Sequence, residues 1–558
     1  MRTFFRFIRL AAELFIGFII LGLLVFALTV RITPPEVAEL PIPSVEQVGP
    51  DHFVSGANWL RKDENDIWVV YIEGEAYERG LAYGALCEKL IRDQEEIFVG
   101  QIKTMIPSDF FLGFLKYFVA WFNKDMDEYV PLEYRKEIYG VSRSFSDDFN
   151  FVAPKYHRVL NYHAAHDIGH ALQDLAIVGC TSFGATNSFS SDSTLIVGRN
   201  FDFYMGPEFS RQRLVTVCRP DSGYGYVSYS WAGLMGVVSG MNEAGLTVTI
   251  NAAKSDLPGG AKDPISLLAR EVLQYAATIE EAEAICARRE VFVSESLLIG
   301  SSKDNRAAII EKSTQKMGVF ESTNDLVVCS NHYQSDAFAD DEANVTNIHM
   351  SDSRYRYQLM NSLLLHNLPL TPEKATAILS ETDGMKGEDI GLGNAKSINQ
   401  LIGHHSVIFK PEQQHFWLSV YPNQIAGMYA YDFQHLLHLS ALDTSSVGVD
   451  SLNIPPRSLY HSRRYTEFLR HLEIKEQIAG YLYFGKSFEL TEELRQEFVR
   501  TNANSYATYM ILGQYYQKSE DCSLATQYYL ESLKHEVLSR AESEKIESLI
   551  HECEEQSH

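Results

Sequence analysis

The chain has 558 residues, of which 45% are hydrophobic and 22% charged, the composition of a globular protein with a large core and about two to four structural units. Its formal net charge of -25 argues against binding along a nucleic-acid backbone, because phosphate affinity comes from clustered Lys and Arg. Seven cysteines without a CxxC pair form neither a disulfide framework nor a zinc site, and we expect no metal and no cofactor.

An apolar segment lies near the start of the chain. After three arginines within the first nine residues, an uninterrupted apolar run from Leu14 to Leu28 continues to Val30 and stops at Arg31. The run is long enough to cross a hydrocarbon core of roughly 30 Å, and the basic start indicates a cytoplasmic N-terminus. We predict an uncleaved membrane anchor over 1–31 and an extracytoplasmic (periplasmic or extracellular) location for the rest. A cleaved signal peptide is the alternative.

The next two segments are predicted to differ in structure. Five prolines between positions 32 and 50 predict an extended tether over 32–65, with folded structure starting near Asp51. Residues 66–179 follow as a helical pre-segment that begins with a strand. Within it, the aromatics of 110–122 fall near helical spacing, and we interpret them as a buried helix face. The alternative is a membrane-proximal or acyl-chain-binding surface.

After Cys180 the sequence alternates between apolar strands and turns. Residues 181–190 and 194–203 predict a hairpin around a Ser-Asp-Ser turn. Helices are expected at 264–277 and 279–288. Further strands are expected at 214–218, 224–231, 233–239, 246–251, 295–301, 307–312, 316–322, 326–330, 406–409 and 415–421. Antiparallel strands with helices grouped between them predict a layered α+β sandwich over 180–445.

Beyond Asp443 the chain becomes strongly helical again. Gly513 and Ala525 are small at the positions where the two helices of one tetratricopeptide (TPR) pair approach each other. We therefore expect a C-terminal helical, TPR-like region over 446–558. A structural cap is the favoured role, and a binding site for a protein partner is the alternative.

The segment Val178-Gly179-Cys180-Thr181-Ser182 is the candidate for chemistry. A free thiol has a pKa of about 8.5 and needs a base, and no papain-like signature supplies one. If the Cys180 thiol attacked the carbonyl of Gly179, hydrolysis of the resulting thioester would leave Cys180 with a free α-amino group. This amine, with a pKa of about 7.7 to 8.0, would be a general base within the nucleophile's own residue. A buried inert cysteine is the alternative.

Five motifs, in shared order over residues 66–425, carry a resemblance to a known family. They are Glu73-Gly74 through Tyr77-Glu78-Arg79-Gly80, Gly179-Cys180-Thr181-Ser182, Gly198-Arg199-Asn200-Phe201-Asp202, Gly240-Met241-Asn242-Glu243-Ala244-Gly245-Leu246 with Asn251, and Ser330-Asn331-His332-Tyr333 with Ser353-Arg354. The chain resembles the N-terminal-nucleophile (Ntn) hydrolases of the peptidase C45 group, which includes acyl-coenzyme A:6-aminopenicillanate acyltransferase. Choloylglycine hydrolases and acid ceramidase are more distantly similar. The resemblance implies a four-layer αββα Ntn-hydrolase sandwich.

The resemblance also implies roles for individual residues. Cys180 would be the nucleophile after cleavage at Gly179, Asp202 would hold its α-amino group, and Arg199 would favour the thiolate. Three more polar residues would lie around the oxyanion and the scissile group: Asn251, Asn331 and Arg354. Taken singly, each of these residues could instead form a surface ion pair, a strand-end cap or a helix start.

We therefore expect a self-cleaving cysteine amidohydrolase or acyltransferase that acts on a small-molecule N-acyl amide, or another non-peptide C–N bond, through a thioester acyl-enzyme at Cys180. Hydrolysis is favoured over transfer from acyl-coenzyme A, because coenzyme A is not expected outside the cytoplasm. Two alternatives stay open. One is a phospholipase B-like ester hydrolase, and the other is a non-catalytic membrane-anchored binding protein that uses the TPR-like tail.

Overall fold

The computed structural model describes residues 32–106, 108–164, 167, 179–255, 260–422 and 424–556. Within these ranges, no helix combines the length and the apolar character needed to span a bilayer. The membrane anchor predicted over 1–31 lies outside the described residues.

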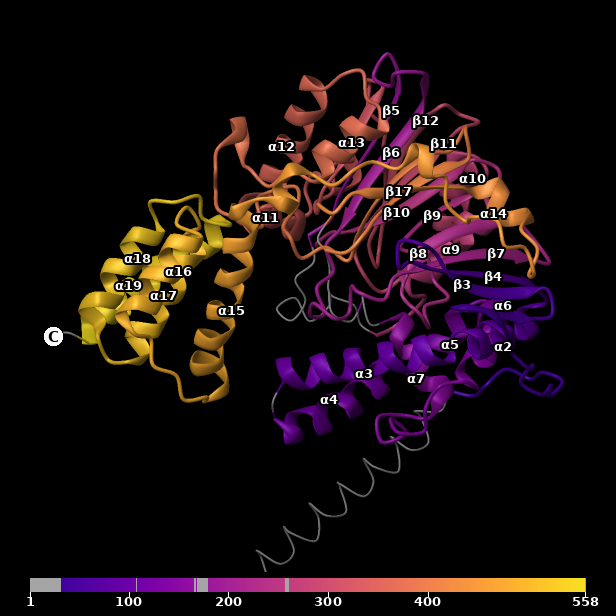
Figure 1. Ribbon diagram of the computed structural model, residues 1–558, viewed down its shortest axis with the longest axis horizontal. Helices are drawn as coiled ribbons and strands as arrows, with labels where there is room; N and C mark the ends of the chain where they lie inside the picture. Colours follow the sequence, from indigo (N-terminus) through magenta and orange to yellow (C-terminus); the bar gives the residue numbers. More distant parts are fainter. Residues whose placement is uncertain are drawn as a thin grey trace, which may run out of the picture.

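Two β-sheets form the centre of the molecule (Figure 1). The larger sheet has eleven strands, in the order β1 (Glu46–Gly49), β2 (His52–Ser55), β3 (Asn58–Lys62), β4 (Trp68–Gly74), β7 (Leu214–Pro220), β8 (Tyr226–Ser230), β9 (Ser239–Asn242), β10 (Leu246–Ala252), β11 (Glu295–Ser301), β12 (Arg306–Lys312) and β13 (Met317–Phe320). The smaller sheet has six, in the order β14 (Leu326–Cys329), β5 (Thr181–Asn187), β6 (Ser193–Phe201), β15 (His405–Lys410), β16 (His415–Ser419) and β17 (Met428–Asp432). The pairing is antiparallel except between β4 and β7.

The alternation of side chains along β6 separates two cores. Leu195 and Val197 pack between the sheets with Leu298 and Ile309 of the larger sheet. Ile196 points the other way, into a core beneath α12 (Ser353–His366) and α13 (Pro372–Leu379). The outer face of the larger sheet is covered by α2 (Ala76–Leu86), α6 (Leu132–Ser142), α9 (Ile265–Tyr275) and α10 (Ile279–Arg288). The predicted α+β class is confirmed, and the layers follow the order helix, sheet, sheet, helix.

The hairpin and most of the strands predicted after Cys180 are present. In the hairpin, Ser182 pairs with Arg199 and Phe183 with Gly198. The two predicted helices are α9 and α10, and α10 begins with a capping box formed by Thr278 and Glu281. The strand predicted over 233–239 is wrong: β9 begins only at Ser239.

The extended tether predicted over 32–65 is also wrong in its second half. β1, β2 and β3 pair in succession and add an edge to the larger sheet beside β4. Trp59 of β3 is buried, stacks on Tyr71 and donates from Nε1 to the carbonyl of Leu439 at 3.3 Å. This edge was missed because short strands rich in polar residues carry little apolar alternation.

The remaining helices of the pre-segment are α3 (Glu88–Met105), α4 (Asp109–Phe122), α5 (Met126–Tyr129) and α7 (Lys155–His163). α4 contains the aromatic segment, and the burial predicted for it is wrong. Phe111, Tyr117, Phe118 and Trp121 are exposed, whereas Phe122 at its end is partly buried against the core.

A buried ion cluster joins the pre-segment to the region after Cys180. Glu137 of α6 accepts from Arg79 of α2 and from Arg270 of α9, both at 2.6 Å, and all three side chains are buried. Burial opposes ionisation of Glu137, but the two guanidinium groups outweigh it and lower its pKa to about 2. The cluster therefore holds the two parts of the chain together through a single carboxylate.

We expect Glu137→Gln to lower the free energy of unfolding by about 3–5 kcal/mol, because it leaves two buried guanidinium groups without a counter-charge. Urea denaturation at pH 7 measures the effect. Glu133→Gln, at a partly exposed neighbour of Arg79, is the control and should lose much less. Equal midpoints for the two variants would show that the cluster contributes no more than a surface pair.

In the chain, α11 (Glu342–Met350) lies between β14 and β15, and α14 (Phe433–His438) follows β17. The C-terminal helices are α15 (Arg463–Phe484), α16 (Glu492–Thr501), α17 (Tyr506–Lys518), α18 (Cys522–Ser532) and α19 (Arg540–Gln556). Gly513 lies against the ring of Tyr529, where an added Cβ would come within 2.4 Å of a ring carbon. Asn502 fixes this helical region to the core through two hydrogen bonds with the backbone of Leu392. The close helix approach expected at Gly513 is present, and the assignment to a TPR repeat stays a prediction.

Candidate active site

Cys180 lies at the start of β5, fully buried at the level where the two sheets meet. Cys180 and Ser182 alternate onto one face of the strand, and the hairpin pairs Ser182 with Arg199 of β6. The register therefore brings the guanidinium to the thiol: Arg199 Nη2 lies 3.6 Å from Cys180 Sγ. Arg199 therefore lies beside the Cys180 thiol, as the sequence predicts.

Both terminal nitrogens of the Arg199 guanidinium are held by acceptors. Its Nη1 donates to the carbonyl of Val238 at 2.7 Å and to Ser239 Oγ, and its Nη2 donates to the carbonyl of Ile250. Its plane lies 4.2 Å from the centre of the Phe201 ring. A cation fixed in this way cannot swing away from the thiol during a reaction.

Burial raises the pKa of the Cys180 thiol, Arg199 lowers it in part, and Asp202 raises it further. In the uncut chain the cation therefore does not by itself produce a thiolate. The Cys180 thiol still needs a base to take up its proton, as the sequence indicates.

Asp202 is a buried carboxyl group beside the predicted cleavage point. Its backbone carbonyl accepts from the N–H of Gly179 at 3.2 Å, and neither oxygen of its side chain has a hydrogen-bond partner among the described residues. Burial raises the pKa of Asp202 to about 7, although Arg356 and Arg199 oppose the shift. A buried unpartnered carboxyl group next to the Gly179–Cys180 bond is a ready site for a newly formed ammonium group.

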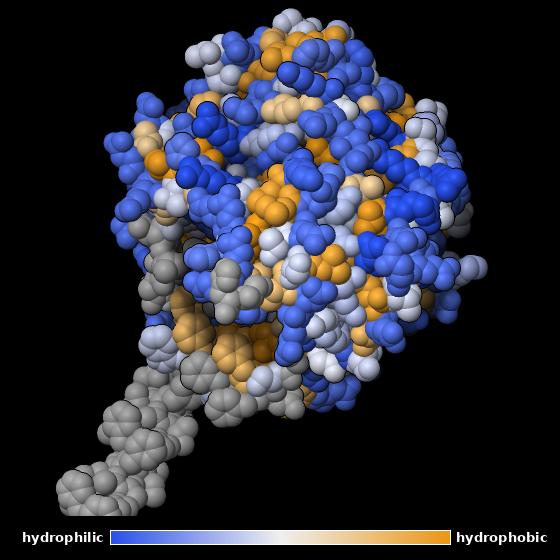
Figure 2. All heavy atoms as spheres, turned by 90° about the vertical axis from the view of Figure 1, so that its left-hand side faces the viewer, coloured by the Kyte–Doolittle hydropathy of each residue, from blue (hydrophilic) through white to orange (hydrophobic). Residues whose placement is uncertain are grey.

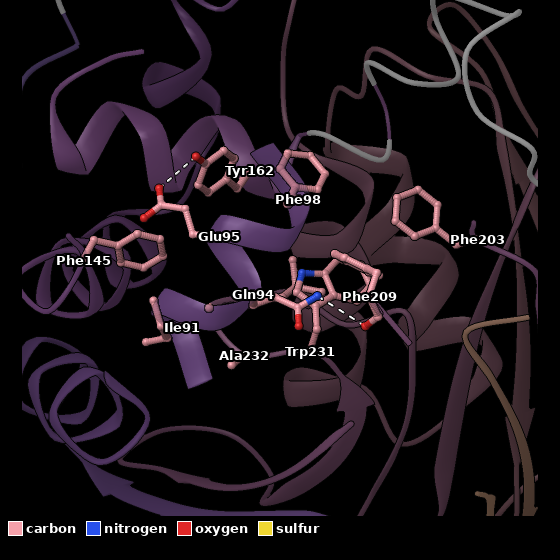
Figure 3. A pocket seen from close by; sticks show the side chains of 12 residues that line it. Ile91, Gln94, Glu95, Phe98, Phe145, Tyr162, Phe203, Phe209, Trp231 and Ala232 are labelled. Carbon is pink, nitrogen blue, oxygen red and sulfur yellow. Dashed lines mark hydrogen bonds between the residues drawn. The ribbon is translucent and has the colours of Figure 1, made fainter. Parts of the chain in front are cut away.

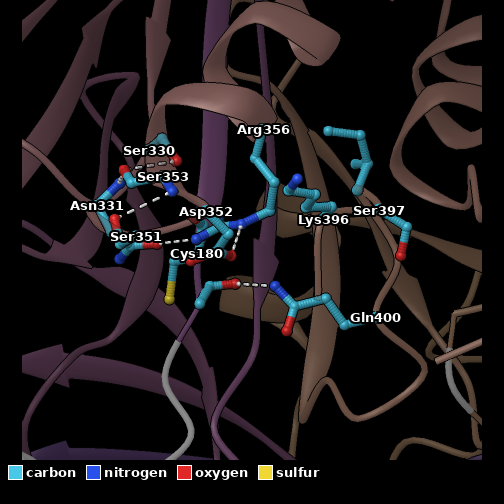
Figure 4. A network of polar contacts seen from close by, with 12 residues as sticks. Cys180, Ser330, Asn331, Ser351, Asp352, Ser353, Arg356, Lys396, Ser397 and Gln400 are labelled. Carbon is cyan, nitrogen blue, oxygen red and sulfur yellow. Dashed lines mark hydrogen bonds and ion pairs between the residues drawn. The ribbon is translucent and has the colours of Figure 1, made fainter. Parts of the chain in front are cut away.

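Two side chains reach the carbonyl oxygens on either side of that bond (Figure 4). Gln400 Nε2 donates to the carbonyl of Gly179 at 3.5 Å, and Arg356 Nη1 donates to the carbonyl of Cys180 at 3.0 Å. Neither residue was predicted from the sequence. Gln400 follows α13 in a loop whose sequence has no motif, so only the folded chain reveals it.

The two predicted asparagines differ in how firmly their amides are engaged. Asn331 Nδ2 donates to the carbonyl of Ala252 at 2.8 Å, and its Oδ1 accepts from Arg356 at 2.8 Å. Asn251 Oδ1 accepts from Ser182 at 3.0 Å, but its Nδ2 makes only 3.5 Å contacts with two carbonyls. The Asn251 amide is therefore the more available donor for an oxyanion, and Asn331 positions Arg356.

Arg354, predicted as the site arginine, is exposed to solvent. Arg356 is buried instead and forms a 2.6 Å ion pair with Asp352 in addition to its contacts with Cys180 and Asn331. Residues two positions apart on a helix point about 200° apart, so α12 can direct only one of the two toward the site. Of the two arginines, it is therefore Arg356 and not Arg354 that contacts Cys180.

We expect Arg356→Lys to slow both self-cleavage and turnover by about 100-fold, because an ammonium group cannot contact the Cys180 carbonyl, Asn331 and Asp352 in the directions that the guanidinium does. Arg354→Lys is the matched control and should leave both rates near wild type. The half-time of chain cleavage and kcat/KM measure the two effects. If both variants lost cleavage and turnover to a similar extent, Arg356 would not be more important than Arg354.

The buried histidines near the site are neutral. Burial holds the pKa of His404 and His405 well below the usual value, and that of His332 at about 4. His405 contacts Ser239 Oγ at 2.9 Å, and His404 contacts His405 at 2.8 Å. Over the described ranges, no three His, Cys, Asp or Glu side chains are grouped to hold a metal ion.

An aromatic cavity adjoins the site (Figure 3). It encloses about 40 Å³, and aromatic side chains make up half of its lining: Phe98, Phe145, Tyr162, Phe203, Phe209 and Trp231. Phe203 stacks on Phe201 at 5.7 Å, and Phe201 lies beneath the Arg199 guanidinium. The cavity is thus linked to Cys180 through two stacked rings, and its walls suit an apolar group.

Parts of the chain are similar to known proteins. Residues 189–421 match the family model of acyl-coenzyme A:6-aminopenicillanic acid acyl-transferase, a range that includes Arg199 and Asp202 and begins after Cys180. An uncharacterized protein of Archaeoglobus fulgidus is 27% identical over 338 residues, which cover 54% of this chain and 55% of that protein. The N-acylethanolamine-hydrolyzing acid amidase of Caenorhabditis elegans is 26% identical over 237 residues, which cover 40% of this chain and 62% of that protein.

Among solved structures, the Caenorhabditis elegans ortholog of N-acylethanolamine-hydrolyzing acid amidase has 19% sequence identity and a TM-score of 0.30, covering 42% of this chain and 93% of that one. The matched regions span only 55% and 62% of the length of the two curated relatives above. The resemblance read from the five motifs is confirmed: residues 189–421 match the model of the acyl-coenzyme A:6-aminopenicillanic acid acyl-transferase family.

Proposed function

We propose that this protein cuts itself between Gly179 and Cys180 and then hydrolyses a small N-acyl amide through a thioester at Cys180. The observation that carries the proposal is the buried carboxyl group of Asp202, which has no hydrogen-bond partner among the described residues and belongs to the residue whose backbone carbonyl accepts from the N–H of Gly179. Burying an unpaired carboxyl group is unfavourable, and cleavage would supply the missing cation.

In the first reaction, Cys180 Sγ attacks the carbonyl carbon of Gly179, and the thiol proton is transferred to the amide nitrogen of Cys180. Gln400 Nε2 lies on the side of the developing oxyanion. The C–N bond then breaks, and Gly179 remains as a thioester on Sγ. Water hydrolyses this thioester, which leaves a carboxylate on Gly179 and a thiol on Cys180 with a free α-amino group.

In the second reaction, that α-amino group accepts the thiol proton and Arg199 stabilises the thiolate at 3.6 Å. The thiolate attacks the amide carbonyl of the substrate, the amine leaves with a proton, and an acyl thioester forms on Cys180. Water releases the acid, whereas an amine would give acyl transfer. Asp202 keeps the α-amino group in place by pairing with its charged form.

The cavity supports an N-acyl substrate with an aliphatic or aromatic tail, because its walls are aromatic and one of them, Phe203, stacks directly on Phe201. The name of the Caenorhabditis elegans relative points to the same class. We further propose the membrane-anchored, extracytoplasmic location, where water is the available acceptor. The C-terminal helices are proposed to cap the core, and a protein partner there stays a prediction.

The test compares N-acyl amides of different tails with phospholipid esters as substrates of the purified full chain. We expect amide hydrolysis by the wild type and by Cys286→Ala, which removes another buried cysteine on α10. Cys180→Ala should hydrolyse neither class. If the wild type cleaves phospholipid esters and leaves amides intact, the proposal is wrong and the phospholipase B-like esterase alternative is supported.

A further inference from the structure

Helix α4 carries a row of exposed aromatic side chains, here called the α4 aromatic face: Phe111, Tyr117, Phe118 and Trp121. Their exposed fractions are 49%, 53%, 38% and 50%. Large contiguous apolar patches on a protein surface mark interaction sites. Figure 2 shows hydrophobic side chains gathered at the lower edge of the molecule, and Figure 1 places the α3 and α4 pair at the lower edge of the same side.

The structure fixes the C-terminal end of α4 and leaves this face outside the body. Phe122 packs edge-on against Phe292 at 5.8 Å, and its carbonyl accepts from the backbone of Ala261 at 3.0 Å. Asn123, which ends the helix, donates to Asn161 of α7 at 2.9 Å. Because the helix is anchored in this way, its aromatic face is a stable feature of the surface and not a frayed end.

The first described residues of the chain contact α7 and α5, the helices next to the same end of α4. The described chain begins at Ile32, whose carbonyl contacts His157 of α7. The next residue, Thr33, hydrogen-bonds through its backbone to the carboxyl group of Asp127, on the α5 helix that follows α4. The apolar run of the sequence ends at Val30, two positions before Ile32.

The charge of the chain argues for an apolar contact with a bilayer over an electrostatic one. A formal net charge of -25 gives no general attraction to anionic lipids, and α4 itself contains only Asp109 and Lys116 as charged residues. Aromatic side chains with a polar edge, such as Trp and Tyr, favour the boundary between headgroups and acyl chains. The contact would therefore be apolar and insensitive to salt.

We propose that α4 is an interfacial helix whose aromatic face enters the lipid bilayer surface, as a second membrane contact beside the predicted anchor. Its neighbour α3 carries Phe98 of the aromatic cavity, and both helices contact Phe151 through Lys103 and Lys116. The bilayer contact would bring that cavity close to acyl chains in the membrane. This last step, delivery of a lipid-borne substrate, rests on the proposed function, and the test below does not use it.

Tryptophan fluorescence tests the contact directly. The full chain is reconstituted in phosphatidylcholine vesicles with brominated acyl chains, which quench tryptophans at membrane depth. Of the five tryptophans, Trp121 is half exposed, whereas Trp59 and Trp417 are buried. We expect quenching in the wild type, its loss in Trp121→Phe, and its retention in Trp68→Phe on β4. Quenching should persist at 1 M salt.

Several results would overturn the proposal. Equal quenching in wild type and Trp121→Phe, or none in the wild type, would show that α4 does not enter the bilayer. An oligomer that dissociates on Phe118→Ser with Trp121→Ser would show instead that a second copy covers the face. Near-ultraviolet circular dichroism of each variant establishes that it is folded, and hydrolysis of a water-soluble amide reports separately on the proposed function.

Discussion

Gln400→Leu is expected to slow cleavage after Gly179 by about 10²–10³-fold, the loss typical of removing one oxyanion donor. Its amide is the side-chain donor placed on the Gly179 carbonyl oxygen among the described residues, and its 3.5 Å distance leaves room to shorten as charge develops on that oxygen. Intact-protein mass spectrometry over time after synthesis measures the rate. Leucine keeps the volume of the side chain and removes the donor.

The same variant separates the two reactions. Once cleavage has occurred, the Gly179 carbonyl is no longer the reacting group, so turnover of an external amide should fall less than self-cleavage does. Gln413→Leu, near the tip of the β5–β6 hairpin, is the control and should cut at the wild-type rate. Unchanged cleavage in Gln400→Leu would mean that another group stabilises the oxyanion.

The uncut chain should lose stability as the pH rises from about 4 to about 7. The folded carboxyl group of Asp202 has a pKa of about 7, whereas its ordinary value is 3.8. Between these values the folded state holds a proton that the unfolded state has released, so the free energy of unfolding falls with pH and levels off above 7. The total change is on the order of 4 kcal/mol, since one pKa unit corresponds to about 1.4 kcal/mol.

Urea denaturation of Cys180→Ala across this pH range measures the loss in a chain that cannot cut itself. Adding Asp202→Asn should flatten that part of the profile, because an amide does not ionise. The cut wild type should also lack it, since the new α-ammonium group would lower the pKa of Asp202. A pH profile that is the same with aspartate and asparagine would place the titration elsewhere.

The core of the site could be predicted because one local element positions it. Alternation and a short turn identify the β5–β6 hairpin, and its antiparallel register alone brings Arg199 opposite Ser182 and next to Cys180. Asp202 follows directly after β6, so its place beside Gly179 also comes from the hairpin. These contacts need little information from distant parts of the chain.

Other contacts depend on how distant segments pack, which one sequence does not reveal. Gln400 lies 221 positions from Gly179 in a loop whose position is set by the helices before it. Arg354 and Arg356 start the same helix, and only its rotation on the small sheet decides which one is buried. The exposure of α4 was missed because an apolar helix next to solvent has the same pattern as one next to a core.

Sequencing the N-termini of the purified full chain tests the central claim most directly. The wild type should give a new N-terminus at Cys180, and Cys180→Ala should give an intact chain without it. The two wild-type pieces should remain together until denatured, because β4 of the first piece pairs with β7 of the second and Glu137 links Arg79 to Arg270. A fully active wild type that keeps the Gly179–Cys180 bond intact would contradict the account.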